Sequence, residues 1–422
     1  MEHAESTFYF VTNADGDVDY KIMQSPENEP QNWEIFVPAR PGYKIEDADM
    51  FKQGCMVLQR SPAGLREMCW VPYADPKNFS PVKVPGRIQA SSVLLHANTD
   101  FDAMQVSFST TTPLAPQTDW HFDIATSTVS SVGTTNVVGR PRFDPGQYKC
   151  TRTSCTSADG TNVPVTLVHR RGIALDGGNP ALVTVYAAYG ECLEPEFRPE
   201  FLPLLQRGWV IVLCHARGGG ELGHKWHRAG AGLQKRATID DLESCVETIH
   251  RHGYTRKGLT AAVGVSAGGL PVAALCNRRP DLLAAVVLRV PYVDPLSTML
   301  DPTLPLTIHE RPEWGDPVAC KDTAEYIRSY CPYYNIANGV HYPAVLATTS
   351  FVDDRVPSWQ PAKYIARLRA ATSELSVGGD DMPRALLLAD NGSGHFGSVD
   401  YGAEFAFLFK SLGLSMDKVS DD

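Results

Sequence analysis

The sequence predicts two regions of different fold class, an all-β region over residues 1–140 and an α/β domain over residues 141–422. Short strand-like runs separated by turn residues fill the first region. In the second region apolar strands alternate with helix-like segments, which is typical of a parallel sheet covered by helices. The length of 422 residues suits one or two large domains, and 43% hydrophobic residues suffice for sizeable cores.

Strands are expected in the first region at residues 8–12, 33–37, 55–59 and 104–108, and no helix-period stretch of useful length lies between them. A strand cluster roughly every 40 residues is typical of the blades of a β-propeller, and the region has room for about three blades. An incomplete ring leaves strand edges and blade faces open. We therefore expect a partner chain or self-association to cover these open propeller edges.

The boundary between the two regions is expected at residues 139–146, a stretch rich in proline, glycine and arginine. A hairpin should follow, with strands at 148–154 and 163–170 and a turn at Asp159-Gly160. Further strands are expected at 182–186, 209–214, 259–263, 284–290, 344–348 and 385–388. The clearest helix is 238–251, whose apolar residues recur on one face and which ends before Gly253.

A serine between two glycines at the end of a strand is the most informative motif. Gly264-Val-Ser-Ala-Gly268 follows the apolar run at 259–263 and precedes a helix-like segment at 269–277. This context is that of a nucleophile elbow, a strained turn that lifts the serine hydroxyl out of the sheet. The flanking glycines let strand and helix approach closely. Ser266 is therefore the candidate nucleophile.

An acid and a histidine follow in the chain order of an α/β-hydrolase. Asp353 and His395 each come directly after an apolar run that predicts a strand. Both therefore belong at the carboxyl edge of the sheet, where ligands bind in this class of fold. His395 would accept the proton of Ser266, and Asp353 would orient the imidazole. Asp354 competes for the role of the acid, and we prefer Asp353.

Two donors are expected to stabilise the oxyanion of a tetrahedral intermediate. One is the backbone N–H of Ala267, the residue after the nucleophile. The other candidate is the hydroxyl of Tyr189, just past the strand at 182–186, where α/β-hydrolases place the second half of the oxyanion hole. Packing of an aromatic side chain is the alternative explanation of this tyrosine.

Composition argues against several other functions. The net charge of −10 disfavours nucleic-acid binding, which needs a basic face. Ten cysteines without a framework spacing indicate free thiols in a reducing cytosol. We expect no signal peptide and no membrane span. The glycine-rich loop at 217–223 lacks the residues that complete a P-loop, and the histidines at 224, 227, 250 and 252 lack further ligands, so we expect no cofactor and no metal.

The motifs together resemble the prolyl oligopeptidase family of serine peptidases, and most closely its oligopeptidase B branch. The similar segments are Tyr186-Ala-Ala-Tyr-Gly190, Arg217-Gly-Gly-Gly-Glu-Leu-Gly223, the elbow around Ser266, Asp353-Asp-Arg-Val356 and Ser393-Gly-His395, with longer signatures at 298–307, 313–317 and 360–363. The resemblance covers about residues 140–415. It implies an α/β-hydrolase domain preceded by a β-propeller, which is truncated here.

The resemblance implies a cytoplasmic serine endopeptidase that cuts short peptides after Arg or Lys. It assigns Ser266, Asp353 and His395 as the catalytic triad and Tyr189 as an oxyanion donor. It also assigns substrate contacts, namely Arg355 to the substrate backbone, Glu310 to a basic P1 side chain, and Glu194 with Glu196 to a basic P2 residue. A carboxylate selects a guanidinium through charge-assisted, bidentate hydrogen bonds. Without the resemblance, each of these glutamates is better explained as a solvated loop charge.

Four positions depart from the family pattern. Phe396 stands where a glycine usually follows the histidine, and Val265 replaces a glycine inside the elbow. Pro312 replaces an acid near Glu310, which would weaken selectivity for basic residues. Pro271 lies early in the helix after the elbow, where it removes one backbone hydrogen bond.

The short propeller region is the larger departure, because about three blades cannot close over an active site as the family's seven do. We therefore expect an exposed site that accepts larger or folded substrates. Two other functions stay open at this point. One is an esterase or acylaminoacyl-type hydrolase on the same fold, and the other is a non-catalytic or impaired relative.

Overall fold

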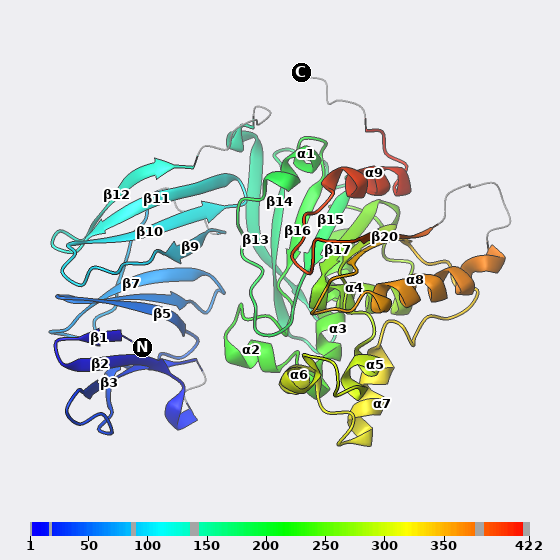
Figure 1. The fold of residues 1–422 in the computed structure, drawn as a ribbon. Helices are drawn as coiled ribbons and strands as arrows, with labels where there is room; N and C mark the ends of the chain where they lie inside the picture. The colour runs from blue at the N-terminus through cyan, green and yellow to red at the C-terminus, as the bar shows by residue number, and fades with distance from the viewer. Residues whose placement is uncertain (1, 17–18, 86–89, 136–142, 376–383, 417–422) are drawn as a thin grey trace. The chain divides into compact units, whose positions relative to one another are not determined.

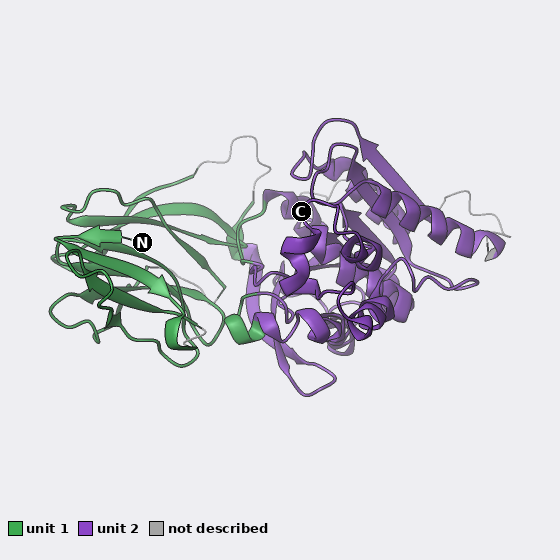
Figure 2. Cartoon of the chain, turned by 60° about the horizontal axis from the view of Figure 1, so that its bottom comes forward, with its two compact units in different colours: residues 1–146, 194–198, 220–226 green, residues 147–193, 199–219, 227–422 purple. Residues whose placement is uncertain are grey.

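The computed structural model describes the chain except residues 1, 17–18, 86–89, 136–142, 376–383 and 417–422 (Figure 1). It divides into two units, coloured separately in Figure 2. Unit 1 comprises residues 1–146, 194–198 and 220–226, and unit 2 comprises residues 147–193, 199–219 and 227–422. The expected boundary between residues 140 and 141 lies outside the described residues.

Unit 1 is built from three four-stranded antiparallel sheets, each formed by one consecutive stretch of chain. The first contains β1 (Glu2–Ala4), β2 (Thr7–Thr12), β3 (Lys21–Pro26) and β4 (Glu34–Val37). The second contains β5 (Lys44–Phe51), β6 (Gly54–Arg60), β7 (Arg66–Pro72) and β8 (Ser80–Pro81). The third contains β9 (Ser92–Leu95), β10 (Gln105–Thr112), β11 (Ala115–Asp123) and β12 (Thr128–Thr134). The four strands expected from the sequence coincide with β2, β4, β6 and β10.

The three sheets pack face to face, as the pattern of β6 shows. Successive side chains of a strand point to opposite faces. Cys55 and Val57 belong to the apolar cluster shared with the first sheet, whereas Met56 and Leu58 belong to the cluster shared with the third. Every residue of β6 is buried because both of its faces are covered. The coverage of the outer edges by a partner or a second copy stays a prediction.

Unit 2 contains one eight-stranded sheet in the order β13-β14-β16-β15-β17-β18-β19-β20. The strands are β13 (Tyr148–Thr156), β14 (Asn162–Arg170), β15 (Ala181–Val185), β16 (Val210–Cys214), β17 (Thr260–Val265), β18 (Ala285–Arg289), β19 (Ala344–Ser350) and β20 (Ala385–Asp390). The first two form the expected antiparallel hairpin, and β15 to β20 run parallel to one another. The carboxyl ends of the parallel strands therefore meet at one edge.

Helices cover both faces of this sheet (Figure 1). The helices of the described chain are α1 (Leu202–Leu205), α2 (His224–Arg228), α3 (Arg236–Arg251), α4 (Gly269–Arg278), α5 (Pro295–Leu300), α6 (Thr307–Trp314), α7 (Lys321–Tyr330), α8 (Trp359–Thr372) and α9 (Tyr401–Ser411). In Figure 1, α1 and α9 lie on one side of the sheet, and α3, α4 and α8 lie on the other. This double coverage buries β15 to β18 and explains why they are continuous apolar runs in the sequence.

Among the residues that the structure describes, no helix combines the length and the apolar character needed to cross a bilayer. The cytoplasmic location stays a prediction.

Candidate active site

The turn between β17 and α4 has the strained conformation expected of a nucleophile elbow. Ser266 has a φ of 53°, in the left-handed region that side chains rarely adopt. A Cβ at Gly264 would lie 2.3 Å from the backbone oxygen of Gly268, and one at Gly268 would lie 2.5 Å from that of Val185. The two glycines of the motif are therefore required because strand, turn and helix approach too closely for any side chain.

The structure brings together the three residues that the sequence proposed as a triad. The Oγ of Ser266 lies 3.0 Å from Nε2 of His395, and Nδ1 of His395 lies 2.8 Å from Oδ2 of Asp353. Each of these residues follows the carboxyl end of a strand, namely β17, β19 or β20. This hydrogen-bond chain joins a hydroxyl, an imidazole and a carboxylate in the arrangement that activates a serine.

Asp353 is held in place by the loop that carries it. Its side chain is fully buried, and its Oδ1 accepts hydrogen bonds from the backbone N–H groups of Arg355 at 2.9 Å and Val356 at 2.8 Å. The other oxygen, Oδ2, is directed at the imidazole. Asp354 is exposed, so the geometry favours Asp353 as the partner of His395.

Tyr189 lies on a second strained turn, just past β15. Both Ala187 and Tyr189 have left-handed backbones, with φ values of 57° and 58°. The Tyr189 hydroxyl donates to Oε2 of Glu310 at 2.5 Å, and Nε1 of Trp314 donates to the same oxygen at 2.6 Å. Burial of the hydroxyl and the adjacent Glu310 carboxylate raise the pKa of Tyr189, so the hydroxyl stays protonated and remains a donor.

The other expected oxyanion donor, Ala267, is the second residue of a short 3₁₀ turn that leads into α4. Backbone N–H groups in the first turn of a helix have no partner within the helix and carry partial positive charge. Ala267 is itself buried, so such a donor acts out of bulk water.

The glycine-rich loop at 217–223 packs against the Tyr189 turn. The N–H of Gly190 donates to the oxygen of Gly218, and a Cβ on Gly218 would lie 2.3 Å from the oxygen of Ala187. Nε and Nη2 of Arg217 donate to the two carboxylate oxygens of Asp241, and Nη1 donates to Asp159. The loop is therefore a packing element beside the site, and its arginine has a structural role.

A buried ion network supports the same turn and was missed by the sequence analysis. Lys235 is fully buried, and its Nζ donates to the oxygen of Ala187 at 2.9 Å and to Oε1 of Glu313 at 3.2 Å. Nε2 of His227 lies 2.6 Å from the other oxygen of Glu313. The Lys235 ammonium also lies 4.6 Å from the centroid of the Trp314 ring. A positive charge therefore fixes the strained carbonyl two residues before Tyr189.

The charges in this network compensate one another. Burial alone would raise the pKa of Glu313, but the hydrogen bond with His227 and the charge of Lys235 hold it below its ordinary value of 4.5. Burial lowers the pKa of Lys235, and Glu313 opposes that effect. The imidazole of His227 thus has a structural role as a partner of a buried carboxylate.

The residues proposed as substrate contacts have different surroundings. Arg355 is exposed, and its guanidinium lies 4.8 Å from the ring centroid of Phe396, which is 81% exposed. Phe396 therefore adds bulk beside His395 on the solvent side and does not disturb the hydrogen bonds of the imidazole. Glu310 is half-buried next to Tyr189.

Glu194 and Glu196 belong to unit 1. The carboxylate of Glu194 is ion-paired with Arg60 and Arg66 and accepts a hydrogen bond from Ser92. Its charge is thus balanced within unit 1, and the contact with a basic P2 residue stays a prediction. Glu196 is exposed.

Three comparisons relate the chain to known proteins. The profile of the prolyl oligopeptidase family matches residues 195–413. The chain is 33% identical to "Prolyl endopeptidase-like" of Pongo abelii and 34% identical to "Dipeptidyl aminopeptidase BI" of Pseudoxanthomonas mexicana, covering 100% and 98% of this chain but 58% and 56% of those proteins. Its fold is similar to oligopeptidase B from Trypanosoma brucei, with a TM-score of 0.90 and 30% identity over 98% of this chain and 59% of that one. The chain thus spans less than three fifths of the length of these relatives.

The network predicts that Lys235→Met lowers the free energy of unfolding by about 3 kcal/mol, because it leaves Glu313 buried with one partner fewer. Urea denaturation followed by near-UV circular dichroism would measure this loss. Lys225→Met is the matched control, since Lys225 is exposed. A loss no larger than that of the control would contradict the role of Lys235.

Glu313 also predicts a pH dependence of stability. Its pKa is lower in the folded chain than its ordinary value of 4.5, so its ionised form stabilises the fold above that pH. The advantage of wild type over Glu313→Gln in unfolding free energy should be constant above about pH 5. It should shrink, by at most about 1.4 kcal/mol per pH unit, as the pH falls below 4.5. The exposed Glu325→Gln serves as control, and a difference that grows on acidification would overturn the assignment.

Proposed function

The chain belongs to the prolyl oligopeptidase family, and from that premise we propose that it is a serine endopeptidase that hydrolyses peptide bonds after Arg or Lys. The observation that carries the proposal is the continuous hydrogen-bond chain from Ser266 through His395 to Asp353. The left-handed conformation of Ser266 adds support, since strained backbone conformations cluster at active sites.

In the proposed reaction, Oγ of Ser266 attacks the scissile carbonyl while Nε2 of His395 takes its proton. Asp353 accepts the Nδ1 hydrogen bond and stabilises the imidazolium that forms. The imidazolium then returns the proton to the leaving amine, which yields an acyl-enzyme on Ser266. A water molecule, deprotonated by His395, hydrolyses that ester and restores the serine.

The Tyr189 hydroxyl and the Ala267 N–H are the proposed donors to the oxyanion of both tetrahedral intermediates. In the free chain the hydroxyl is already committed to Glu310. A guanidinium or ammonium that pairs with Glu310 neutralises this acceptor, so Tyr189 is released to donate to the oxyanion. A basic P1 side chain would thus complete the site as it binds, whereas a neutral one would leave the tyrosine engaged.

Glu310 is the observation that favours Arg and Lys over other substrates. The names of the relatives include prolyl endopeptidase-like, dipeptidyl aminopeptidase and oligopeptidase B, so family membership does not select one specificity. Glu310 is half-buried, and its nearest described partners are the neutral donors Tyr189 and Trp314. A half-buried carboxylate that has no cationic partner among the described residues suits a substrate cation.

Two alternative functions are compatible with the same site. An esterase or acylaminoacyl-type hydrolase needs the same triad, because acyl transfer to serine is common to all three activities. A catalytically impaired relative would keep the fold without an activated serine. Reactivity of Ser266 distinguishes an impaired relative from the proposed peptidase. The effect of replacing Glu310 on the turnover of arginine peptides distinguishes an esterase or acylaminoacyl-type hydrolase from it.

We predict that a fluorophosphonate probe labels the wild-type chain and that Ser266→Ala abolishes labelling. His395→Ala should slow labelling by at least about 10³-fold, because the serine then lacks its base. Mass spectrometry of the labelled peptide would locate the adduct. Ser329→Ala, at an exposed serine on α7, is the control and should label like wild type. A wild-type chain that resists the probe would identify an impaired relative.

We also predict that Glu310→Gln lowers kcat/KM for a peptide with P1 arginine by about 10- to 100-fold, the value of a charge-assisted hydrogen bond. The same peptide with citrulline at P1 has the same shape without the charge, and its kcat/KM should change little. Glu325→Gln provides the control for charge removed elsewhere on unit 2. An equal loss of kcat/KM for both peptides, or no loss for the arginine peptide, would favour the esterase or acylaminoacyl-type hydrolase.

A further inference from the structure

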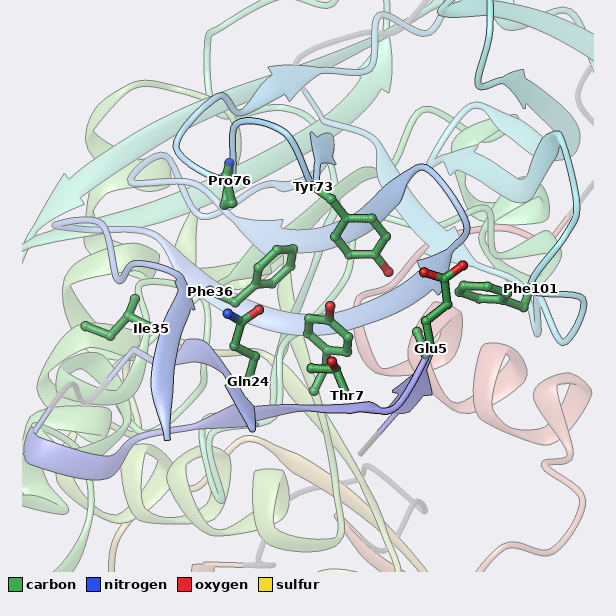
Figure 3. A pocket seen from close by; sticks show the side chains of 10 residues that line it. Glu5, Thr7, Gln24, Ile35, Phe36, Tyr73, Pro76 and Phe101 are labelled. Carbon is green, nitrogen blue, oxygen red and sulfur yellow. The ribbon is translucent and has the colours of Figure 1, made fainter. Parts of the chain in front are cut away.

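A pocket of about 340 Å³ lies within unit 1, away from any residue given a role above. It is formed where the first sheet meets loops of the second and third. Its lining residues are Ala4, Glu5, Thr7, Tyr9, Gln24, Ile35, Phe36, Tyr73, Pro76 and Phe101 (Figure 3). This volume is within the range of small-molecule sites.

Four of the ten residues that line this pocket, Tyr9, Phe36, Tyr73 and Phe101, are aromatic. The ring of Tyr9 lies 4.9 Å from that of Phe36 in an edge-to-face arrangement and 5.8 Å from that of Tyr73. The centroids of Phe36 and Tyr73 are 5.6 Å apart. Tyr9 and Phe36 are buried in the apolar cluster that joins the first two sheets, and Tyr73 packs against that cluster. The three rings are thus fixed by the core and do not need a ligand to hold them.

The charge of the pocket is negative. Of the ten lining residues, all within the described part of the chain, Glu5 is the one with a formal charge at neutral pH. Figure 3 shows its carboxylate between the side chains of Tyr73 and Phe101. Burial raises the pKa of Tyr9 and of Tyr73, so both phenols stay neutral. Glu5 is exposed and joins β1 to β2, so it is accessible from solvent.

We propose that this pocket binds an organic cation with an apolar stem, such as the side chain of an arginine or lysine residue. The faces of aromatic rings attract cations, and the attraction grows when water is excluded. Glu5 supplies the counter-charge and oxygen acceptors for a guanidinium or ammonium. Ile35, Phe36 and Pro76 offer apolar surface to the stem. The proposal does not rest on the peptidase activity, because none of these residues belongs to the site in unit 2.

The experiment is a calorimetric titration of the full 422-residue chain carrying Ser266→Ala and Glu310→Gln. These two changes prevent turnover and remove the proposed P1 carboxylate, so binding reports on the pocket alone. The probe is N-acetyl-arginine amide. Its matched control is N-acetyl-citrulline amide, which keeps the shape and lacks the charge. Agmatine is titrated in parallel to separate a free cation from a residue within a peptide.

Arginine amide should bind at least about tenfold more tightly than citrulline amide. Adding Glu5→Gln, or separately Tyr73→Ala, should weaken its binding by about tenfold, whereas Glu34→Gln at an exposed position of β4 should not. Affinity for agmatine equal to that for the amide assigns the site to free cations, and preference for the amide assigns it to peptides. Either supports the proposal.

Equal binding of the arginine and citrulline probes would overturn the proposal, as would absence of binding or an affinity that Glu5→Gln leaves unchanged. Thermal unfolding of each variant, compared with its parent, shows whether the fold persists. If Tyr73→Ala unfolds the unit, the conservative Glu5→Gln still decides the outcome.

Discussion

The arrangement of Ser266, His395 and Asp353 in unit 2 depends on one constraint, the convergence of loops at the carboxyl edge of a parallel sheet. β17, β19 and β20 run in the same direction, so the residues after them meet although they are far apart in the chain. The hydrogen bonds from Ser266 to His395 and from His395 to Asp353 exist because of this convergence. The left-handed turn at Ser266 then sets the height of the hydroxyl above the sheet, and two glycines make that turn sterically accessible.

A second strained turn follows β15. Ala187 and Tyr189 both adopt left-handed conformations, and the buried ammonium of Lys235 binds the carbonyl oxygen of Ala187. Glu313 balances that ammonium, while Glu310 on the same helix accepts the Tyr189 hydroxyl. Helix α6 thus supplies Glu313, which balances the ammonium that binds the turn, and Glu310, which accepts the hydrogen bond of the Tyr189 hydroxyl. Recognition of a basic side chain and stabilisation of an oxyanion would be coupled through one carboxylate.

Much of the site was predictable because its residues follow strands in a recognisable order. A G-x-S-x-G motif, an acid and a histidine each came after an apolar run, and this was enough to place Ser266, Asp353 and His395. The Lys235–Glu313 pair was not predictable, since its members are 78 positions apart and neither lies in a motif with a known partner. The family resemblance assigned Glu194 to substrate, and nothing in the sequence indicated its ion pair in unit 1. Its pairing with Arg60, 134 positions away, leaves no mark in a single sequence.

The most direct measurement is a crystal structure of the chain with a peptide aldehyde that ends in argininal. We predict a covalent bond from Ser266 Oγ to the aldehyde carbon, with the hemiacetal oxygen hydrogen-bonded to Tyr189. The guanidinium should pair with Glu310, and the bond from Tyr189 to Glu310 seen in the free chain should be broken. An adduct whose guanidinium lies elsewhere while Tyr189 still donates to Glu310 would contradict the coupling, and an unmodified Ser266 would contradict the peptidase itself.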